Sequence, residues 1–243
     1  MRENQQYINF TDYFTLHMTK AGFIFDLDGV IVDTAGYHFL AWKKLADELG
    51  IPFTKTDNER FKGVSRKRCL EILLEMGNIT VSSEQFDQWL QEKNKDYLSY
   101  IDTMNETEIL PDVIKVLDYL KQRNIPMALG SASKNARPIL EKVKLIPYFN
   151  TVVDGNAVTK AKPDPEVFIK AAEALDIAPE HCVVFEDARA GIKAANAAGM
   201  RSVGIGSSEV LSEADHNFNN FTEIDLDFLS DLVSELNGGA KHF

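Results

Sequence analysis

Two aspartates, Asp26 and Asp28, stand one residue apart in the run FDLDG, directly after a short apolar segment. Four more residues with reactive or charged side chains follow at intervals along the chain: Ser131, Lys162, Glu186 and Asp187. A lone pair of aspartates is common in turns, because short acidic side chains cap the backbone there. The pair gains meaning only if the fold brings the later residues to the same place.

Together these residue types suit the transfer of a phosphoryl group. A carboxylate can attack phosphorus and become an aspartyl phosphate, while a lysine neutralises charge on the group in transit. A second carboxyl group two residues further on can share the same side of a cleft and can move a proton. Several carboxylates held together are costly without a cation, and Mg²⁺ prefers such oxygen ligands. We therefore expect Mg²⁺ as the cofactor.

The elements that must position these residues are short apolar strands alternating with helices. Strands are predicted at 22–27, 125–131, 151–155, 181–187 and 201–206. Helices are predicted between them, among them one with an apolar face that opens at Pro111 and one over 134–144. Such alternation predicts a parallel sheet with helices on both faces. Ligands of open α/β sheets bind outside the carboxyl ends of the strands, which is where the reactive residues fall.

A helical segment interrupts this alternation after the first strand. Helices are predicted at 37–49, 70–76 and 82–101, with no strand pattern among them. The first strand needs a partner in the sheet, so the helical segment is predicted to be an insertion. We expect an α/β fold with a Rossmann-like parallel sheet core and an inserted helical cap domain. The expected parts are an N-terminal extension over 1–20, a core over 21–34 and 107–243, and the cap over 35–106.

Composition excludes several classes of protein. The chain has 243 residues and a formal net charge of −11, which argues against a nucleic-acid partner. Its two cysteines, Cys69 and Cys182, lie far apart, so neither a disulfide scaffold nor a zinc site is expected. No apolar run approaches the length of about 18 residues that a membrane span needs, and no signal peptide is evident. We expect a cytoplasmic monomer that acts on a small molecule.

The sequence resembles the haloacid dehalogenase-like phosphotransferase superfamily. The resemblance rests on FDLDGVIVDT (25–34), Ser131, Lys162 in AKPDPEVF and FEDARAGI (185–192), which match the four motifs of the superfamily in order. Within it, the β-phosphoglucomutase family is more closely similar, through KGVSR (62–66), EKNKDY (92–97) and GSASKN (130–135).

This resemblance implies a role for each matching residue. Asp26 would be the nucleophile and Asp28 the general acid and base. Mg²⁺ would be held by Asp26, the backbone carbonyl of Asp28, Glu186 and Asp187. Ser131 and Lys162 would hold the phosphoryl group in transit, and Arg66, Ser133 and Asn135 a second, distal phosphate. The cap residues His38, Trp42 and Lys93 would face the substrate, and Thr34 would lie at the hinge.

The function implied is a phosphomutase that interconverts β-D-glucose 1-phosphate and glucose 6-phosphate through a bisphosphate. Two related alternatives are a Mg²⁺-dependent sugar-phosphate phosphatase of the same architecture and a mutase for another sugar phosphate. They share the core motifs, and only the cap residues Arg66, His38 and Lys93 favour the mutase. A non-catalytic scaffold is disfavoured, because the reactive residues Asp26 and Lys162 are both present.

Overall fold

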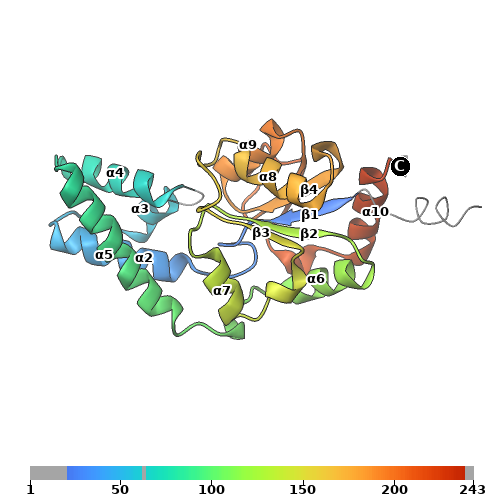
Figure 1. The fold of residues 1–243 in the computed structure, drawn as a ribbon, viewed down its shortest axis with the longest axis horizontal. Coiled ribbons are helices and arrows are strands. Elements are labelled where there is room, and N and C mark those ends of the chain that lie inside the picture. The colour runs from blue at the N-terminus through green and yellow to red at the C-terminus, as the bar shows by residue number, and fades with distance from the viewer. Residues whose placement is uncertain (1–20, 62–63, 239–243) are drawn as a thin grey trace, which may run out of the picture.

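A computed structural model describes residues 21–61 and 64–238 (Figure 1). The extension expected over 1–20 lies outside the described residues. Six parallel strands form one sheet in the order β3-β2-β1-β4-β5-β6. Their bounds are β1 Gly22–Phe25, β2 Met127–Gly130, β3 Thr151–Val153, β4 Cys182–Glu186, β5 Arg201–Ile205 and β6 His216–Phe218. This is the predicted Rossmann-like sheet.

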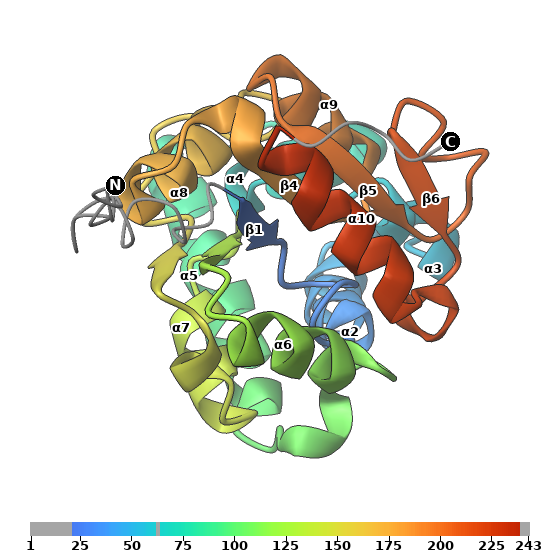
Figure 2. The ribbon, with the colours of Figure 1, turned by 90° about the vertical axis from the view of Figure 1, so that its right-hand side faces the viewer.

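Helices cover both faces of the sheet, as the alternating side chains of β1 require. Phe23 and Phe25 pack into one cluster of buried residues, and Ile24 packs into another. The first cluster is shared with α6 (Val113–Gln122), α7 (Ala136–Lys142) and α10 (Leu226–Leu236). The second is shared with α8 (Glu166–Leu175) and α9 (Arg189–Ala197). Figure 2 shows α8 and α9 above the strands and α6 below them, with α10 crossing in front.

The inserted cap stands beyond one end of the sheet (Figure 1). It consists of α2 (Ala35–Glu48), α3 (Lys55–Glu59), α4 (Arg66–Gly77) and α5 (Ser83–Ile101). These helices have a buried cluster of their own, with Trp42 and Leu70 in it. A bridge between Val32 and Ile109 pairs the two segments that connect the cap to the core.

Several predicted boundaries were wrong, each for a local reason. The helix expected from Pro111 begins at Val113, after the left-handed Asp112. The helix expected from Lys134 begins at Ala136, because the preceding residues form a hydrogen-bonded turn. Helix α3 was missed, since its five polar residues have no apolar period, although Thr54 and Asp57 form a capping box. Strand β6 was missed because it is a short, half-buried edge strand.

Among the residues that the structure describes, no helix has the length and apolarity to cross a membrane.

Candidate active site

The core of the site is an ion-paired cluster at the carboxyl ends of β1 and β4. These strands are neighbours in register, Phe25 beside Phe185, so the acids that follow them meet. The ammonium of Lys162 lies 2.6 Å from Oδ1 of Asp26 and 2.7 Å from Oε2 of Glu186. All three side chains are buried. The structure thus brings together three of the residues predicted from sequence.

Burial and charge shift the acid–base behaviour of this cluster. Burial by itself lowers the pKa of Lys162, but the charges of Asp26 and Glu186 outweigh it and raise that pKa above its usual range. Burial raises the pKa of Glu186, as do the nearby carboxylates, against the opposing effect of Lys162. Three carboxyl groups, counting Asp187, lie around one ammonium here, so the cluster would carry excess negative charge with all three ionised.

That excess, and the donor chemistry, fit a divalent cation. Asp26, Glu186 and Asp187 each offer a carboxylate oxygen, and these atoms all lie within 4.8 Å of one another. Two glycines make room for the acids. A Cβ on Gly29 would come within 2.2 Å of Oδ2 of Asp187, and one on Gly191 within 2.0 Å of Oε2 of Glu186. Hard oxygen ligands in this number suit Mg²⁺.

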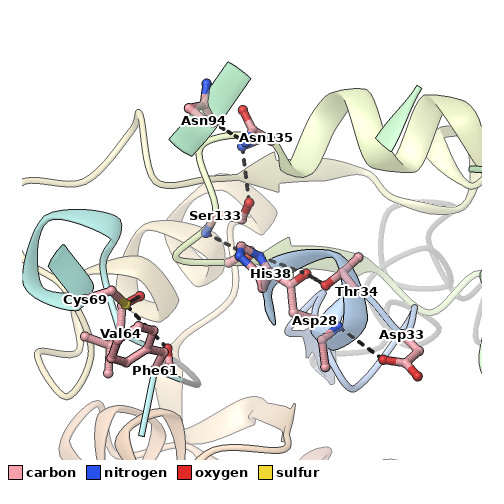
Figure 3. A network of polar contacts seen from close by, with 12 residues as sticks. Asp28, Asp33, Thr34, His38, Phe61, Val64, Cys69, Asn94, Ser133 and Asn135 are labelled. Atoms are coloured by element: carbon pink, nitrogen blue, oxygen red, sulfur yellow. Dashed lines mark hydrogen bonds and ion pairs between the residues drawn. The ribbon is translucent and has the colours of Figure 1, made fainter. Parts of the chain in front are cut away.

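The carboxylate of Asp28 contacts Thr34, at the predicted hinge. Its Oδ1 accepts a short hydrogen bond from the hydroxyl of Thr34, a fully buried residue just before α2 (Figure 3). Nε2 of His38 lies 4.0 Å from the same oxygen. Burial, and next the charge of Asp26, raises the pKa of Asp28 from 3.8 to about 6. A carboxyl group tuned in this way can both give and take a proton near neutral pH.

The cap presents a buried lysine to this hinge region. Lys93 of α5 is 2 % exposed, and its ammonium lies 4.7 Å from the ring centre of Trp42 and 4.6 Å from that of Tyr97. It lies 3.1 Å from Nδ1 of His38, whose ring stacks on Tyr97. Burial lowers the pKa of Lys93 to about 7 and, with the charges of Lys93 and Arg66, lowers the pKa of His38 well below 6.5. His38 is therefore neutral at pH 7.

The turn after β2 carries the predicted phosphate contacts. Ser131 follows β2 and is buried. Its Oγ accepts from the backbone N–H of Ser133 at 3.1 Å, and Oγ of Ser133 accepts from that of Asn135 at 3.2 Å. The Asn135 amide donates to Oδ1 of Asn94, on α5 of the cap, at 2.9 Å (Figure 3).

Arg66 is placed apart from the ion-paired cluster. It is the first residue of α4, directly after the N-cap Ser65, and burial lowers its pKa. It lines a cavity of about 500 Å³ together with residues along one face of α5, Asn94 among them. Asp26 and Glu186 pair with Lys162 and not with Arg66.

Sequence reasoning missed two site residues. Asn94 and Tyr97 both lie in the run EKNKDY, which supports the resemblance, but only Lys93 was singled out there. In the sequence, Tyr97 fits the apolar stripe of its helix. Its packing against His38 and Lys93 arises between two helices, so no spacing within one helix could show it.

The chain is similar to several known proteins. A profile of the haloacid dehalogenase-like hydrolases matches residues 20–199. A β-phosphoglucomutase of Bacillus subtilis is 41% identical over 208 residues, 85% of this chain and 92% of the relative. A phosphorylated carbohydrates phosphatase of Thermotoga maritima is 35% identical, with 74% and 82% covered. The crystal structure of a β-phosphoglucomutase from Clostridium difficile is 40% identical, with a TM-score of 0.85 over 90% of this chain and 98% of that one.

These similarities agree with the parallel sheet, the inserted cap and the acidic site at the strand ends. The profile covers strands β1 to β4, the cap and the acids at the end of β4. The chain belongs to the haloacid dehalogenase-like hydrolase family.

Proposed function

We propose that this enzyme is a phosphomutase that interconverts β-D-glucose 1-phosphate and glucose 6-phosphate through β-glucose 1,6-bisphosphate. The observation that carries the proposal is the meeting of cap and core at Asp28, where the hinge residue Thr34 and the cap residue His38 both approach one carboxylate. A mutase needs its proton-transferring group to respond to the cap. The 41% identity to a β-phosphoglucomutase supports the choice of sugar.

In this proposal Asp26 is the nucleophile. A carboxylate oxygen of Asp26 attacks phosphorus, the bond from phosphorus to the sugar oxygen breaks, and an aspartyl phosphate forms. Lys162, 2.6 Å from Asp26, neutralises charge on the group in transit, and the Ser131 hydroxyl donates to one of its oxygens.

Asp28 moves the proton in both directions. As the acid, it protonates the sugar oxygen that leaves. As the base, it accepts the proton of the sugar hydroxyl whose oxygen attacks the aspartyl phosphate, which restores the Asp26 carboxylate. A pKa of about 6 keeps both forms of Asp28 accessible near neutral pH.

Asp26, Glu186 and Asp187 would hold Mg²⁺, with the backbone carbonyl of Asp28 as a further ligand. When bound, the ion would neutralise charge on the phosphoryl group. The carboxylate of Asp28 accepts a hydrogen bond from Thr34, and we do not assign it as a metal ligand.

The remaining predicted residues would bind the rest of the sugar phosphate. Arg66, Ser133 and Asn135 would hold the phosphate that is not in transit, in or beside the cavity that Arg66 lines. His38, Trp42 and Lys93 would face the sugar from the cap. A closed cap would keep water from the aspartyl phosphate. We also propose the core over 21–34 and 107–243, the cap over 35–106, and a cytoplasmic monomer.

A sugar-phosphate phosphatase is the second candidate. Its support is the 35% identity to the Thermotoga maritima phosphatase and the 32% identity to a fructose-1-phosphate phosphatase of Escherichia coli. The same core residues would serve both reactions, with water as the acceptor in the phosphatase.

One assay separates the two. The purified protein receives β-glucose 1-phosphate, Mg²⁺ and a trace of β-glucose 1,6-bisphosphate, and glucose 6-phosphate and orthophosphate are measured together. Glucose 6-phosphate without stoichiometric orthophosphate is the expected result, and it should vanish in Asp26→Asn. Orthophosphate as the main product would contradict the mutase and support the phosphatase.

A further inference from the structure

One hydrogen bond joins the cap directly to the predicted phosphate-binding turn. Oδ1 of Asn94, on α5, accepts from Nδ2 of Asn135 at 2.9 Å (Figure 3). Asn94 also lines the cavity that Arg66 lines. Asn135 is itself 9 % exposed, so its amide has little access to bulk water.

The backbone of this turn is fixed by the core. Val153 of β3 accepts from the N–H of Ser131 at 3.0 Å, and Gly155 donates to the carbonyl of Ser133 at 3.1 Å. The Asn156 side chain donates to the carbonyl of Lys134 at 2.9 Å. The cap is therefore not needed to hold the backbone in place.

The orientation of the Asn135 amide is a different matter. A side-chain amide can rotate by half a turn, which exchanges its donor for its acceptor. With Oδ1 of Asn94 opposite, the NH₂ group of Asn135 faces the cap, because only that orientation makes a hydrogen bond with an oxygen. The second N–H of this group remains able to donate to an anion, whereas the rotated amide would present its oxygen and repel one.

We propose that Asn94 is a positioning residue that holds the Asn135 amide with its donors directed toward the cap side, ready for the distal phosphate of the substrate. This inference rests on the proposed function, because it assigns the ligand of Asn135 to the phosphate that is not in transit. Asn94 acts through Asn135 and touches no reacting atom.

The test is a double-mutant cycle on ligand binding. Calorimetry measures the Kd of the Mg²⁺-loaded full chain for glucose 6-phosphate in wild type, Asn94→Ala, Asn135→Ala and the double variant. Asn94→Ala should weaken binding about three- to tenfold, the effect of one lost hydrogen bond. Added to Asn135→Ala, it should have no further effect, because its only route is already removed.

Kinetics provide the readout that a structural role would not give. Asn94→Ala should raise the KM for β-glucose 1-phosphate with kcat little changed, and should leave the hydrolysis of p-nitrophenyl phosphate, which has no distal phosphate, unaffected. Gln88→Ala removes an exposed amide of the same helix, which donates to Glu92 at 2.8 Å and lies outside the lining of the cavity. It is the matched control and should match wild type.

Two outcomes would overturn the inference. Unchanged binding in Asn94→Ala would show that Asn135 does not need the contact. If Asn94→Ala weakened binding by the same factor in wild type and in Asn135→Ala, Asn94 would act by another route. Orthophosphate as the only product of a wild type whose binding cycle behaves as expected would refute the mutase and leave the role of Asn94 intact.

Discussion

Lys162 decides the charge balance of the site. Its side chain is 1 % exposed and serves two carboxylates at once, those of Asp26 and Glu186. A buried ion pair contributes little net stability compared with apolar packing, but breaking one leaves an uncompensated charge. Losing this one cation would therefore affect both stability and metal binding.

Lys162→Met should lower the free energy of unfolding by about 3–5 kcal/mol in Mg²⁺-free buffer. Mg²⁺ should restore more stability to this variant than to wild type, since a bound cation would replace the lost charge. Thermal unfolding with and without Mg²⁺ measures both effects. Lys170→Met, which breaks the half-exposed pair with Glu166, is the control and should cost less than about 1 kcal/mol. Equal losses in the two variants would contradict the argument.

Lys93 shows the opposite environment for a lysine. Two aromatic rings and a neutral His38 surround its ammonium, and the groups that influence its charge are Arg66, Cys69 and Asp28. Burial lowers its pKa from 10.5 to about 7. The unfolded chain therefore binds more protons than the folded one between these two values, and the free energy of unfolding rises with pH across that window.

Lys93→Met should remove this pH dependence. The variant should be more stable than wild type near pH 7, and its advantage should shrink toward pH 10 by at most about 1.4 kcal/mol per pH unit. Denaturant unfolding at several pH values is the measurement. Lys95 is an exposed neighbour on the same helix, and Lys95→Met should differ in stability from wild type by the same amount at every pH. If the stability difference between Lys93→Met and wild type were also the same at every pH, the lysine would be charged throughout this pH range.

The turn between β1 and α2 leaves the space that the side chain of Asp187 occupies. Gly29 has a φ of 77° and lies where any Cβ would strike Asp187. Gly50, after α2, also has a positive φ, 68°, but open space around it. Substitutions at the two glycines therefore distinguish the effect of backbone strain alone, at Gly50, from that of a clash with Asp187, at Gly29.

Gly29→Ala should lower the affinity for Mg²⁺ by about tenfold or more, because Asp187 must move. Gly50→Ala should cost about 1 kcal/mol of stability from its left-handed backbone, with metal affinity unchanged. Calorimetric titration of Mg²⁺ into both variants compares them. Equal affinities would show that Asp187 is not a ligand, or that it adjusts freely.

At the scale of the whole molecule, two adjoining connections join the cap to the core. Besides the Val32–Ile109 bridge, the hydroxyl of Tyr37 on α2 donates to Glu108 on the returning segment at 2.8 Å. This bond ties the first turn of the cap to the second connection. How firmly the cap closes should therefore depend on it.

Tyr37→Phe should raise the share of phosphoryl groups lost to water, measured as orthophosphate per glucose 6-phosphate formed. Tyr148→Phe is the matched control, since its hydroxyl donates to Asp118, also at 2.8 Å, within the core. Both variants should lose a similar stability of about 1 kcal/mol, and only Tyr37→Phe should change the product ratio. If the two variants gave the same ratio of orthophosphate to glucose 6-phosphate, the hydrogen bond between Tyr37 and Glu108 would not affect closure of the cap.

Much of this protein follows from local sequence. The apolar runs predicted five of the six strands, because a buried strand needs a continuous hydrophobic segment. Three of the four cap helices, α2, α4 and α5, were predicted from their 3.6-residue period, whereas α3 was missed. The meeting of Asp26, Lys162 and Glu186 was also predicted, since parallel strands bring their carboxyl ends to one edge.

Contacts between elements were decided only by the tertiary structure. The sequence could not show that Lys93 would be buried between two rings, because its neighbours along α5 are charged and read as a solvated face. Neither could it show that Asn94 meets Asn135, 41 positions away on the other side of the hinge. Such contacts depend on how helices pack across the insertion, and no residue spacing within one element encodes that geometry.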